Sequence, residues 1–378
     1  NTALGHSAME TNTTGTANVA VGSLSLDANT TGSNHTAVGR QALSANTTSS
    51  SNTALGGNTL ATNTTGNFNT AVGYDSLVAN TTGPDNTGVG KDALLANTTG
   101  CRNVAVGSCA LKANTTGVEN QAIGYLSMNS NTEGGCNVGI GAALQSNTTG
   151  GNNVGIGFIA LSNNTTASGN TAVGRSALQE NTTGTANTAV GCGALDANTT
   201  GGDQTAMGRN ALGSNTTAVG TNSMRLNTTG ASNVAIGYNA LDANTTGGNN
   251  IAIGDNALGA NTTNTTNLAI GASALLANNG SGDNMAIGQQ AASSNLNGFH
   301  VTAIGHYSLL SNTSAQGNTA VGHSALYSNT TGSPNTAVGK QALCKNTTGA
   351  GNVAVGYAAL CLNTTAGGNT AVGLNSLL

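Results

Sequence analysis

The chain has 378 residues, of which 56 are Gly, and a formal net charge of −4; only 6% of its residues are charged and 2% are aromatic. A typical globular domain has about 25% charged residues, so this composition excludes an ordinary globular core built around large rings. The absence of runs of like charge argues against a nucleic-acid surface, and no apolar stretch is long enough to predict a membrane span.

A unit of 17 residues repeats along the sequence, with the consensus N-T-A-V-G-x-x-A-L-x-A-N-T-T-G-x-x. We number its positions 1 to 17 and count 22 units, which start at Asn1 and are followed by the fragment from Asn369 to Leu378. A fixed period of this length is typical of solenoids, in which each repeat forms one coil and stacks on its neighbours. Residues 1–378 are therefore predicted to form a single continuous solenoid domain, and a start within the repeat, at Asn1, is what we expect of a processed or partial chain.

Two units depart from this period. The unit at residues 137–152 lacks one residue between Gly141 and Asn147, and the unit at residues 204–215 is shorter still. In the second unit one turn is deleted, so that Asn215-Thr216-Thr217 runs directly into the next Ala-Val-Gly. We expect a local kink or narrowing of the solenoid there.

Positions 2 to 4 predict a short β-strand in every unit. Position 4 is always aliphatic or Met, position 2 is Thr or mostly aliphatic, and position 3 is only Ala or Gly. Because side chains alternate along a strand, positions 2 and 4 share one face, and we expect that face to point inward. Position 9, which is Leu in most units, predicts a second apolar layer.

Two corners bound the predicted strand. Position 5 is Gly in every unit, and Gly accepts the positive φ that a sharp corner demands. Positions 12 to 15 read Asn-Thr-Thr-Gly, which predicts a second corner. Because little room is left for a helix, the sequence predicts an all-β fold, a parallel β-solenoid of about 22 coils.

The small residues at position 3 suggest lateral association. A stripe of Ala and Gly lets a neighbouring backbone approach closely, so we expect a trimer or a filament of copies. The alternative is that position 3 packs within its own chain, and the sequence favours neither.

The strongest chemical signal is Asn-Thr-Thr at positions 12 to 14, which matches the N-glycosylation pattern Asn-x-Ser/Thr. Position 12 is Asn in all 22 units, and Asn131, Asn278 and Asn295 are the ones outside the pattern. The alternative is an internal ladder, because stacked amides about 4.8 Å apart can hydrogen-bond to one another and a buried Asn cannot carry a glycan. The candidate glycosylation sites are Asn12, Asn29, Asn46, Asn63, Asn80, Asn97, Asn114, Asn147, Asn164, Asn181, Asn198, Asn215, Asn227, Asn244, Asn261, Asn312, Asn329, Asn346 and Asn363.

Other polar positions give weaker signals. Position 6 varies between residues such as Tyr, Arg, Lys and His, which indicates an exposed corner and, alternatively, a ligand-facing stripe. Cys344 and Cys361 occupy position 10 of adjacent units, a spacing that suits a disulfide. The other four cysteines lie at unmatched positions, and no arrangement of His, Cys or carboxylates predicts a catalytic, cofactor or metal site.

The segment from Asn69-Thr70-Ala71-Val72-Gly73 through Asn80-Thr81-Thr82-Gly83 resembles repeats of phage tail-fibre and bacterial surface proteins that carry a C-terminal intramolecular chaperone. The resemblance covers the whole chain. More distantly, the unit is similar to the head repeats of trimeric autotransporter adhesins. These resemblances imply a parallel β-solenoid or an intertwined trimeric fibre.

We therefore expect a non-catalytic structural fibre or filament subunit, located outside the cell, on the cell surface or on a virion. Its expected partners are further copies of itself and, if the Asn-Thr-Thr sites are modified, glycans. One alternative is an adhesin or phage tail-fibre shaft. Another is an ice-binding solenoid that presents Asn and Thr of positions 12 and 14 on one face.

Overall fold

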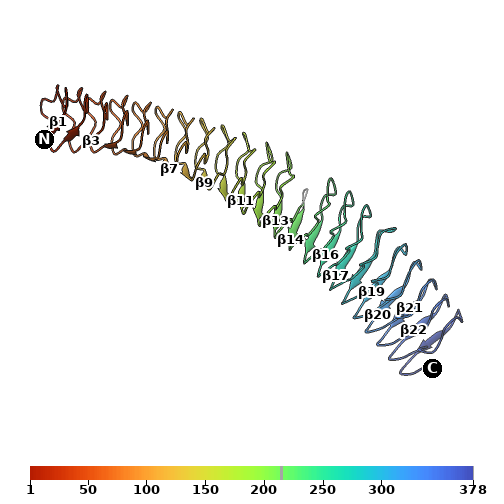
Figure 1. Cartoon of the computed structure of the whole chain (residues 1–378). Helices are drawn as coiled ribbons and strands as arrows, with labels where there is room; N and C mark the ends of the chain where they lie inside the picture. Colours follow the sequence, from red (N-terminus) through yellow and green to blue (C-terminus); the bar gives the residue numbers. More distant parts are fainter. Residues whose placement is uncertain (213–215, 378) are drawn as a thin grey trace. The chain divides into compact units, whose positions relative to one another are not determined.

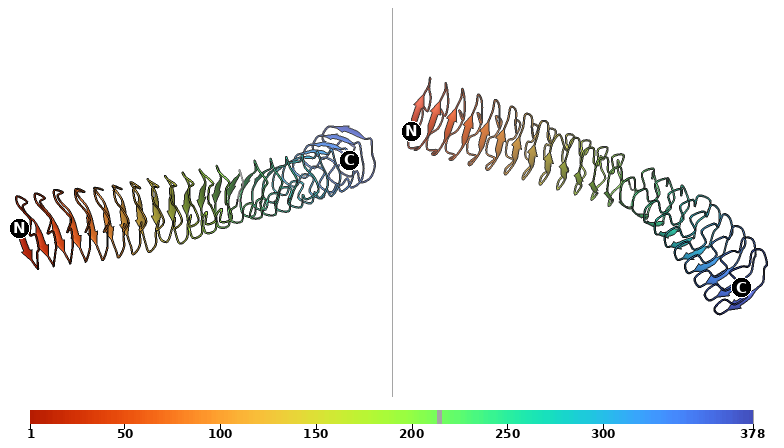
Figure 2. Two further views of the ribbon diagram at one scale, coloured as in Figure 1. Left: turned by 90° about the horizontal axis from the view of Figure 1, so that it is seen from above. Right: turned by 60° about the horizontal axis from the view of Figure 1, so that its bottom comes forward.

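The chain folds as an all-β parallel β-solenoid of about 22 turns with a repeat of about 17 residues. The computed structural model describes residues 1–212 and 216–377, and this part of the chain contains no helix. It divides into two compact units, Asn1–Gly201 and Gly202–Leu378. Within each unit, Figures 1 and 2 show successive coils stacked with their strands in one row.

Each coil contributes one strand of three residues from positions 2 to 4 of the repeat. The strands of the first unit are β1 (Thr2–Leu4), β2 (Val19–Val21), β3 (Thr36–Val38), β4 (Thr53–Leu55), β5 (Thr70–Val72), β6 (Thr87–Val89), β7 (Val104–Val106), β8 (Gln121–Ile123), β9 (Val138–Ile140), β10 (Val154–Ile156), β11 (Thr171–Val173) and β12 (Thr188–Val190). Those of the second unit are β13 (Thr205–Met207), β14 (Thr217–Val219), β15 (Val234–Ile236), β16 (Ile251–Ile253), β17 (Leu268–Ile270), β18 (Met285–Ile287), β19 (Thr302–Ile304), β20 (Thr319–Val321), β21 (Thr336–Val338), β22 (Val353–Val355) and β23 (Thr370–Val372).

Neighbouring strands within each unit pair in parallel, and equivalent repeat positions lie opposite one another. Val72, for example, is the partner of Val89, 17 residues later. The two irregular coils keep this register, because Val138 pairs with Val154 and Thr205 pairs with Thr217. The shortened coils therefore lose residues outside the strand. Residues 213–215, on which part of the predicted kink falls, lie outside the described residues.

The predicted orientation of the strand is wrong. Position 3 points into the solenoid, and residues such as Ala20 and Ala105 are fully buried. Positions 2 and 4 point outward instead, so that Leu55 is 46% exposed and Ile123 is 42% exposed. The physical reason is the width of the coil: position 3 lies directly against positions 8 and 9, which leaves space for no more than Ala.

This tight interior is visible at Gly139, which occupies position 3. A Cβ added there would lie 2.8 Å from Ser127 Oγ and 3.0 Å from Met128 Cγ, both in the preceding coil. A Val or Ile pointing inward would clash with the same neighbours. The alternative that position 3 packs within its own chain is therefore the correct one, and this stripe is closed to a second chain.

The second apolar layer is confirmed. Leu94 and Leu111 at position 9 are fully buried, as are their counterparts in most coils. These leucines have φ near +50°, a left-handed conformation that costs about 1–2 kcal/mol for an L-residue. It directs the Leu94 N–H along the solenoid axis to the carbonyl of Ala110 at 3.0 Å. Burying the leucine side chain, worth about 1.5–3 kcal/mol, offsets that cost.

The predicted glycine corner is also confirmed. Gly107 at position 5 has φ +138°, and a Cβ added there would lie 2.5 Å from the carbonyl oxygen of Gly124. Both the backbone angle and the close approach of the next coil therefore require Gly at this position.

Candidate functional site

The outward side chains of positions 2 and 4 form one continuous stripe within each unit, which we call the strand face. Position 4 is Val, Ile, Leu or Met in every described strand, whereas position 2 is Thr in 13 of these 23 strands, aliphatic or Met in nine, and Gln121 in β8. Many of the aliphatic members are more than one third exposed, for example Val106 at 37%. In other proteins, contiguous rows of exposed apolar side chains are typical of interaction sites.

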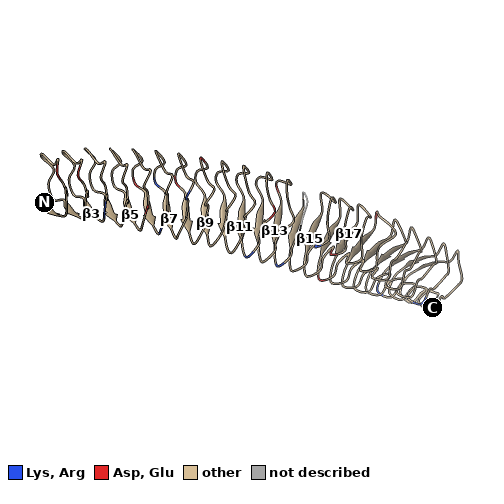
Figure 3. Ribbon diagram, turned by 45° about the horizontal axis from the view of Figure 1, so that its top comes forward, with Lys and Arg blue, Asp and Glu red and all other residues tan. Residues whose placement is uncertain are grey.

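The strand face also carries no charge. None of the strands β1 to β23 contains a Lys, Arg, Asp or Glu. The charged side chains lie on the turns instead, as Figure 3 shows by the tan strands and the coloured loops. Arg102 pairs with Glu119, Lys112 with Asp92, and Arg225 with Asp242.

Position 12 forms the internal ladder that the sequence offered as an alternative to glycosylation. The Asn97 Nδ2 donates to Asn80 Oδ1 at 2.8 Å and to the Gly100 carbonyl at 3.0 Å. Asn97 Oδ1 in turn accepts a hydrogen bond from Asn114 Nδ2 at 2.8 Å. The Asn97 amide thus links its own coil to the coils before and after it.

This ladder occupies the nitrogen to which a glycan would be attached. Asn29, Asn46, Asn63, Asn80, Asn97, Asn114, Asn147, Asn164, Asn181, Asn227, Asn244, Asn261, Asn312, Asn329 and Asn346 are buried, whereas Asn12, Asn198 and Asn363 are partly exposed. Asn215 lies outside the described residues. In the folded chain the buried amides have no space for a sugar. Whether any site is modified remains a prediction.

Outside position 12, four asparagines that the repeat pattern did not predict match Asn-x-Ser/Thr: Asn163 and Asn264 are partly exposed, whereas Asn34 and Asn279 are exposed. Asn34 is followed by His35 and Thr36, and Asn279 is followed by Gly280 and Ser281. A search of the sequence that ignored the repeat register would have found them.

The surface predicted for ice binding does not exist in that form. Asn at position 12 points into the interior, while the Thr at position 14, such as Thr99, is exposed. The two side chains therefore do not share an outer face. The hydroxyl at position 13 is already hydrogen-bonded within the solenoid, because the Thr98 hydroxyl donates to the Thr115 carbonyl at 3.1 Å.

The predicted cysteine pair is adjacent in space. Cys344 and Cys361 are both free thiols and both half-buried. Burial, followed by the charge and hydrogen bond of the neighbouring Cys361 thiol, raises the pKa of Cys344. The disulfide between them stays a prediction, and Cys101, Cys109, Cys136 and Cys192 are free as well.

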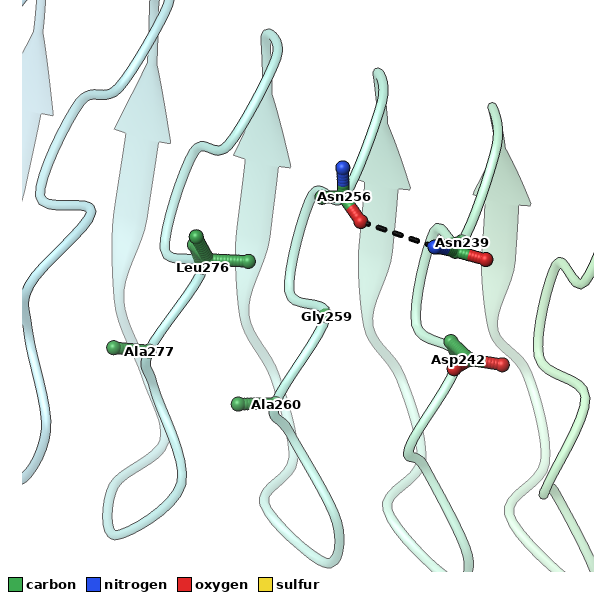
Figure 4. A pocket seen from close by; sticks show the side chains of 7 residues that line it. All are labelled: Asn239, Asp242, Asn256, Gly259, Ala260, Leu276 and Ala277. Carbon is green, nitrogen blue, oxygen red and sulfur yellow. Dashed lines mark hydrogen bonds between the residues drawn. The ribbon is translucent and has the colours of Figure 1, made fainter.

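Position 6 lies on an exposed corner, as predicted, and Tyr125 is 66% exposed there. Beside this corner, the second unit has a hollow of about 320 Å³ lined by Asn239, Asp242, Asn256, Gly259, Ala260, Leu276 and Ala277. Figure 4 shows that it lies where Gly259 leaves a gap between the side chains of Asp242 and Leu276.

The polar groups of this hollow already have partners. Asn239 Nδ2 donates to Asn256 Oδ1 at 3.3 Å. The carboxylate of Asp242 accepts two hydrogen bonds from Arg225, at 3.0 and 3.3 Å. The hollow is therefore a gap in the side-chain columns.

Across residues 1–212 and 216–377, no group of three or more His, Cys, Asp or Glu side chains is placed to hold a metal ion. The same residues include no helix long and apolar enough to cross a membrane. Comparison with known proteins adds no family: no family model matches the chain, and no curated protein matches it.

Proposed function

We propose that this chain is a non-catalytic structural fibre segment whose copies associate side by side through the strand face. The observation behind this proposal is the uncharged strand face, in which a column of exposed aliphatic side chains at position 4 lies beside a column of Thr and aliphatic residues at position 2. The resemblance of the repeat sequence to phage tail-fibre and bacterial surface repeats supports a location outside the cell, on a cell surface or on a virion. A shaft of an adhesin or of a phage fibre is the form of this function that the resemblance favours.

The size of the strand face is adequate for such association. A strand of three residues stacked every 4.8 Å covers roughly 48 Å² of flat surface per coil. The strands β1 to β12 of the first unit therefore offer roughly 570 Å², or about 1,100 Å² when two copies meet, which is close to the lower bound for a specific interface. The second unit presents a strand face of its own.

The repeat also makes the strand face complementary to itself. Every copy has the same spacing between coils, so outward columns on one copy match columns on another at many registers. No like charges oppose each other across such a contact, because the strands contain no charged residue. We therefore take further copies of this chain to be the partner.

The test places charges on the strand face. In the variant Val106→Lys, Ile123→Glu, Ile140→Lys, three neighbouring outward positions become charged with alternating sign, so they attract one another within the coil stack. The desolvation of these charges opposes contact with a second copy. At equal concentration, we expect sedimentation velocity to show less of the larger species for the variant than for the wild type, because three coils of the strand face no longer contribute to the contact.

The matched control changes the neighbouring corner of the same coils: Ser108→Lys, Tyr125→Glu, Ala142→Lys. It carries the same charges and should sediment like the wild type. Circular dichroism verifies that both variants keep their β-structure. A strand-face variant that associates as the wild type does would overturn the proposal, and so would a wild-type protein that electron microscopy shows only as single chains.

Ice binding is a second candidate function, and the strand face is now the surface that we consider for it. Outward Thr at position 2 alternates with outward Val or Ile at position 4 in a flat array, as in β11 and β12. Such arrays order water when they face solvent, which self-association prevents. Purified single chains that produce no thermal hysteresis would remove this candidate.

A further inference from the structure

Asn at position 1 of the repeat forms a second amide ladder, in which each side chain makes one hydrogen bond within its own coil and one to the next coil. In the second coil, Asn18 Nδ2 donates to the Gly32 carbonyl of the same coil at 2.9 Å, which closes the coil. Its Oδ1 accepts the backbone N–H of position 1 in the next coil, that of His35, at 2.9 Å. The side chain therefore needs one donor and one acceptor at fixed places.

His35 occupies position 1 in the third coil and supplies both groups from its ring. Its Nε2 lies 2.8 Å from the Ser49 carbonyl, where the amide nitrogen of Asn would donate. Its Nδ1 accepts the backbone N–H of Asn52 at 3.3 Å, where the amide oxygen would accept. These two contacts require the neutral tautomer with the proton on Nε2.

The surroundings of the ring offer no compensation for a positive charge. His35 is 1% exposed. The ring lies within hydrogen-bond distance of Asn46, Ser49 and Asn52, none of which is charged. Asn46 Nδ2 lies 3.2 Å from Nε2 and donates to Asn29 Oδ1 at 2.8 Å, so the Nε2 proton is directed to the closer Ser49 carbonyl. Burial lowers the pKa of His35 from its ordinary value of 6.5, and the hydrogen bond to the Ser49 carbonyl acts in the opposite direction.

We propose that His35 is an acid-sensitive link between the third and fourth coils of the first unit. Protonation adds a hydrogen to Nδ1, which turns the acceptor for the Asn52 N–H into a donor that faces it. The imidazolium therefore cannot replace the asparagine amide, and the neutral imidazole can. Acid then opens the position-1 ladder at this coil.

The direction of the effect follows from linkage. Because the unfolded coil binds the proton more tightly than the folded one, the contribution of His35 to stability is complete above about pH 6.5 and is lost as the pH falls below it. Among the described residues at position 1, His35 is the only titratable one; Gln204, Thr216 and Val301 are the other departures from Asn. The effect is therefore local to this coil.

The substitution His35→Asn restores the consensus of the repeat and provides the test. We would measure amide hydrogen exchange by mass spectrometry on the full chain, in peptides that contain Asn52, at about pH 7.5 and about pH 5. The ratio of the wild-type rate to the His35→Asn rate removes the intrinsic pH dependence of exchange. A peptide that contains Asn103, where Asn86 Oδ1 accepts the N–H at 3.0 Å, serves as the internal reference.

We expect the ratio at Asn52 to rise by at least about tenfold on acidification and the ratio at Asn103 to stay constant. An unchanged ratio at Asn52 overturns the proposal. The imidazole signals of the wild type, followed by NMR, provide an independent measurement that does not depend on the variant. A His35 ring that titrates at or above its ordinary pKa also overturns the proposal.

Discussion

At the scale of the residue, each asparagine of position 12 is held by hydrogen bonds that a substitution would leave unpaired. Removing the amide of Asn97 leaves Asn80 Oδ1 and Asn114 Nδ2 without their partner in a buried environment. An unsatisfied buried polar group costs about 1–3 kcal/mol, which is more than the net gain from a typical hydrogen bond. The ladder therefore explains the constancy of Asn at this position by folding alone.

One pair of variants distinguishes the folding role of Asn at position 12 from a role as a glycosylation site. Asn97→Ala and Thr99→Ala both destroy the Asn-Thr-Thr match, but only the first breaks the ladder, because Thr99 is exposed. We expect Asn97→Ala to lower the free energy of unfolding in urea by about 2 kcal/mol or more, and Thr99→Ala to change it by less than about 0.5 kcal/mol. Equal losses in the two variants would contradict the ladder account.

The positive φ of the leucines at position 9 could not be predicted from the sequence. Positive φ is expected of Gly, Asn or Asp, and several residues at positions 7 and 17 fit that expectation, such as Asn58 and Asp85. Leu at position 9 does not, although Leu60 has φ +50°. The conformation is imposed by the fully buried side chain and by the hydrogen bond to the next coil, and both exist only after the coils stack.

At the scale of the element, the three-residue strand could be predicted, but the face that points inward could not. Alternation places positions 2 and 4 on one side and position 3 on the other, and the larger side chains suggested the wrong side. The inward face is determined by the space opposite the strand, where the residues at positions 8 and 9 leave room for a side chain no larger than a methyl group. That distance depends on the path of both corners, which the sequence pattern alone does not specify.

The coil at Gly88 provides a test of this packing. Here position 3 is Gly, and Ser76, at position 8 of the preceding coil, donates its hydroxyl to the Gly88 carbonyl at 3.0 Å. A Cβ added to Gly88 would lie 2.6 Å from Ser76 Oγ. We expect Gly88→Ala to destabilise the chain by about 1–3 kcal/mol in urea unfolding.

The double variant Gly88→Ala, Ser76→Ala recreates the Ala–Ala pair that most coils contain at these positions. It should recover the loss, so the two substitutions should be strongly coupled in a double-mutant cycle. Additive effects would indicate that position 3 does not face position 8, contrary to the orientation described here.

At the scale of the whole molecule, the solenoid, its period and its ladders could be predicted from the repeat, because equivalent residues must stack when one coil follows another. The candidate interaction surface was placed wrongly on position 3, since that placement depended on the inward face of the strand. The strand face has larger side chains than the Ala and Gly stripe and, unlike that stripe, it is exposed.

The central claim, that copies of the chain associate through the strand face, is tested most directly by sedimentation equilibrium of the full chain over a wide range of concentrations. The account predicts a mass of at least two chains of 36.5 kDa each. It also predicts that the mass falls toward that of one chain on dilution or when the strand face carries charges. A mass of 36.5 kDa at every concentration would contradict it.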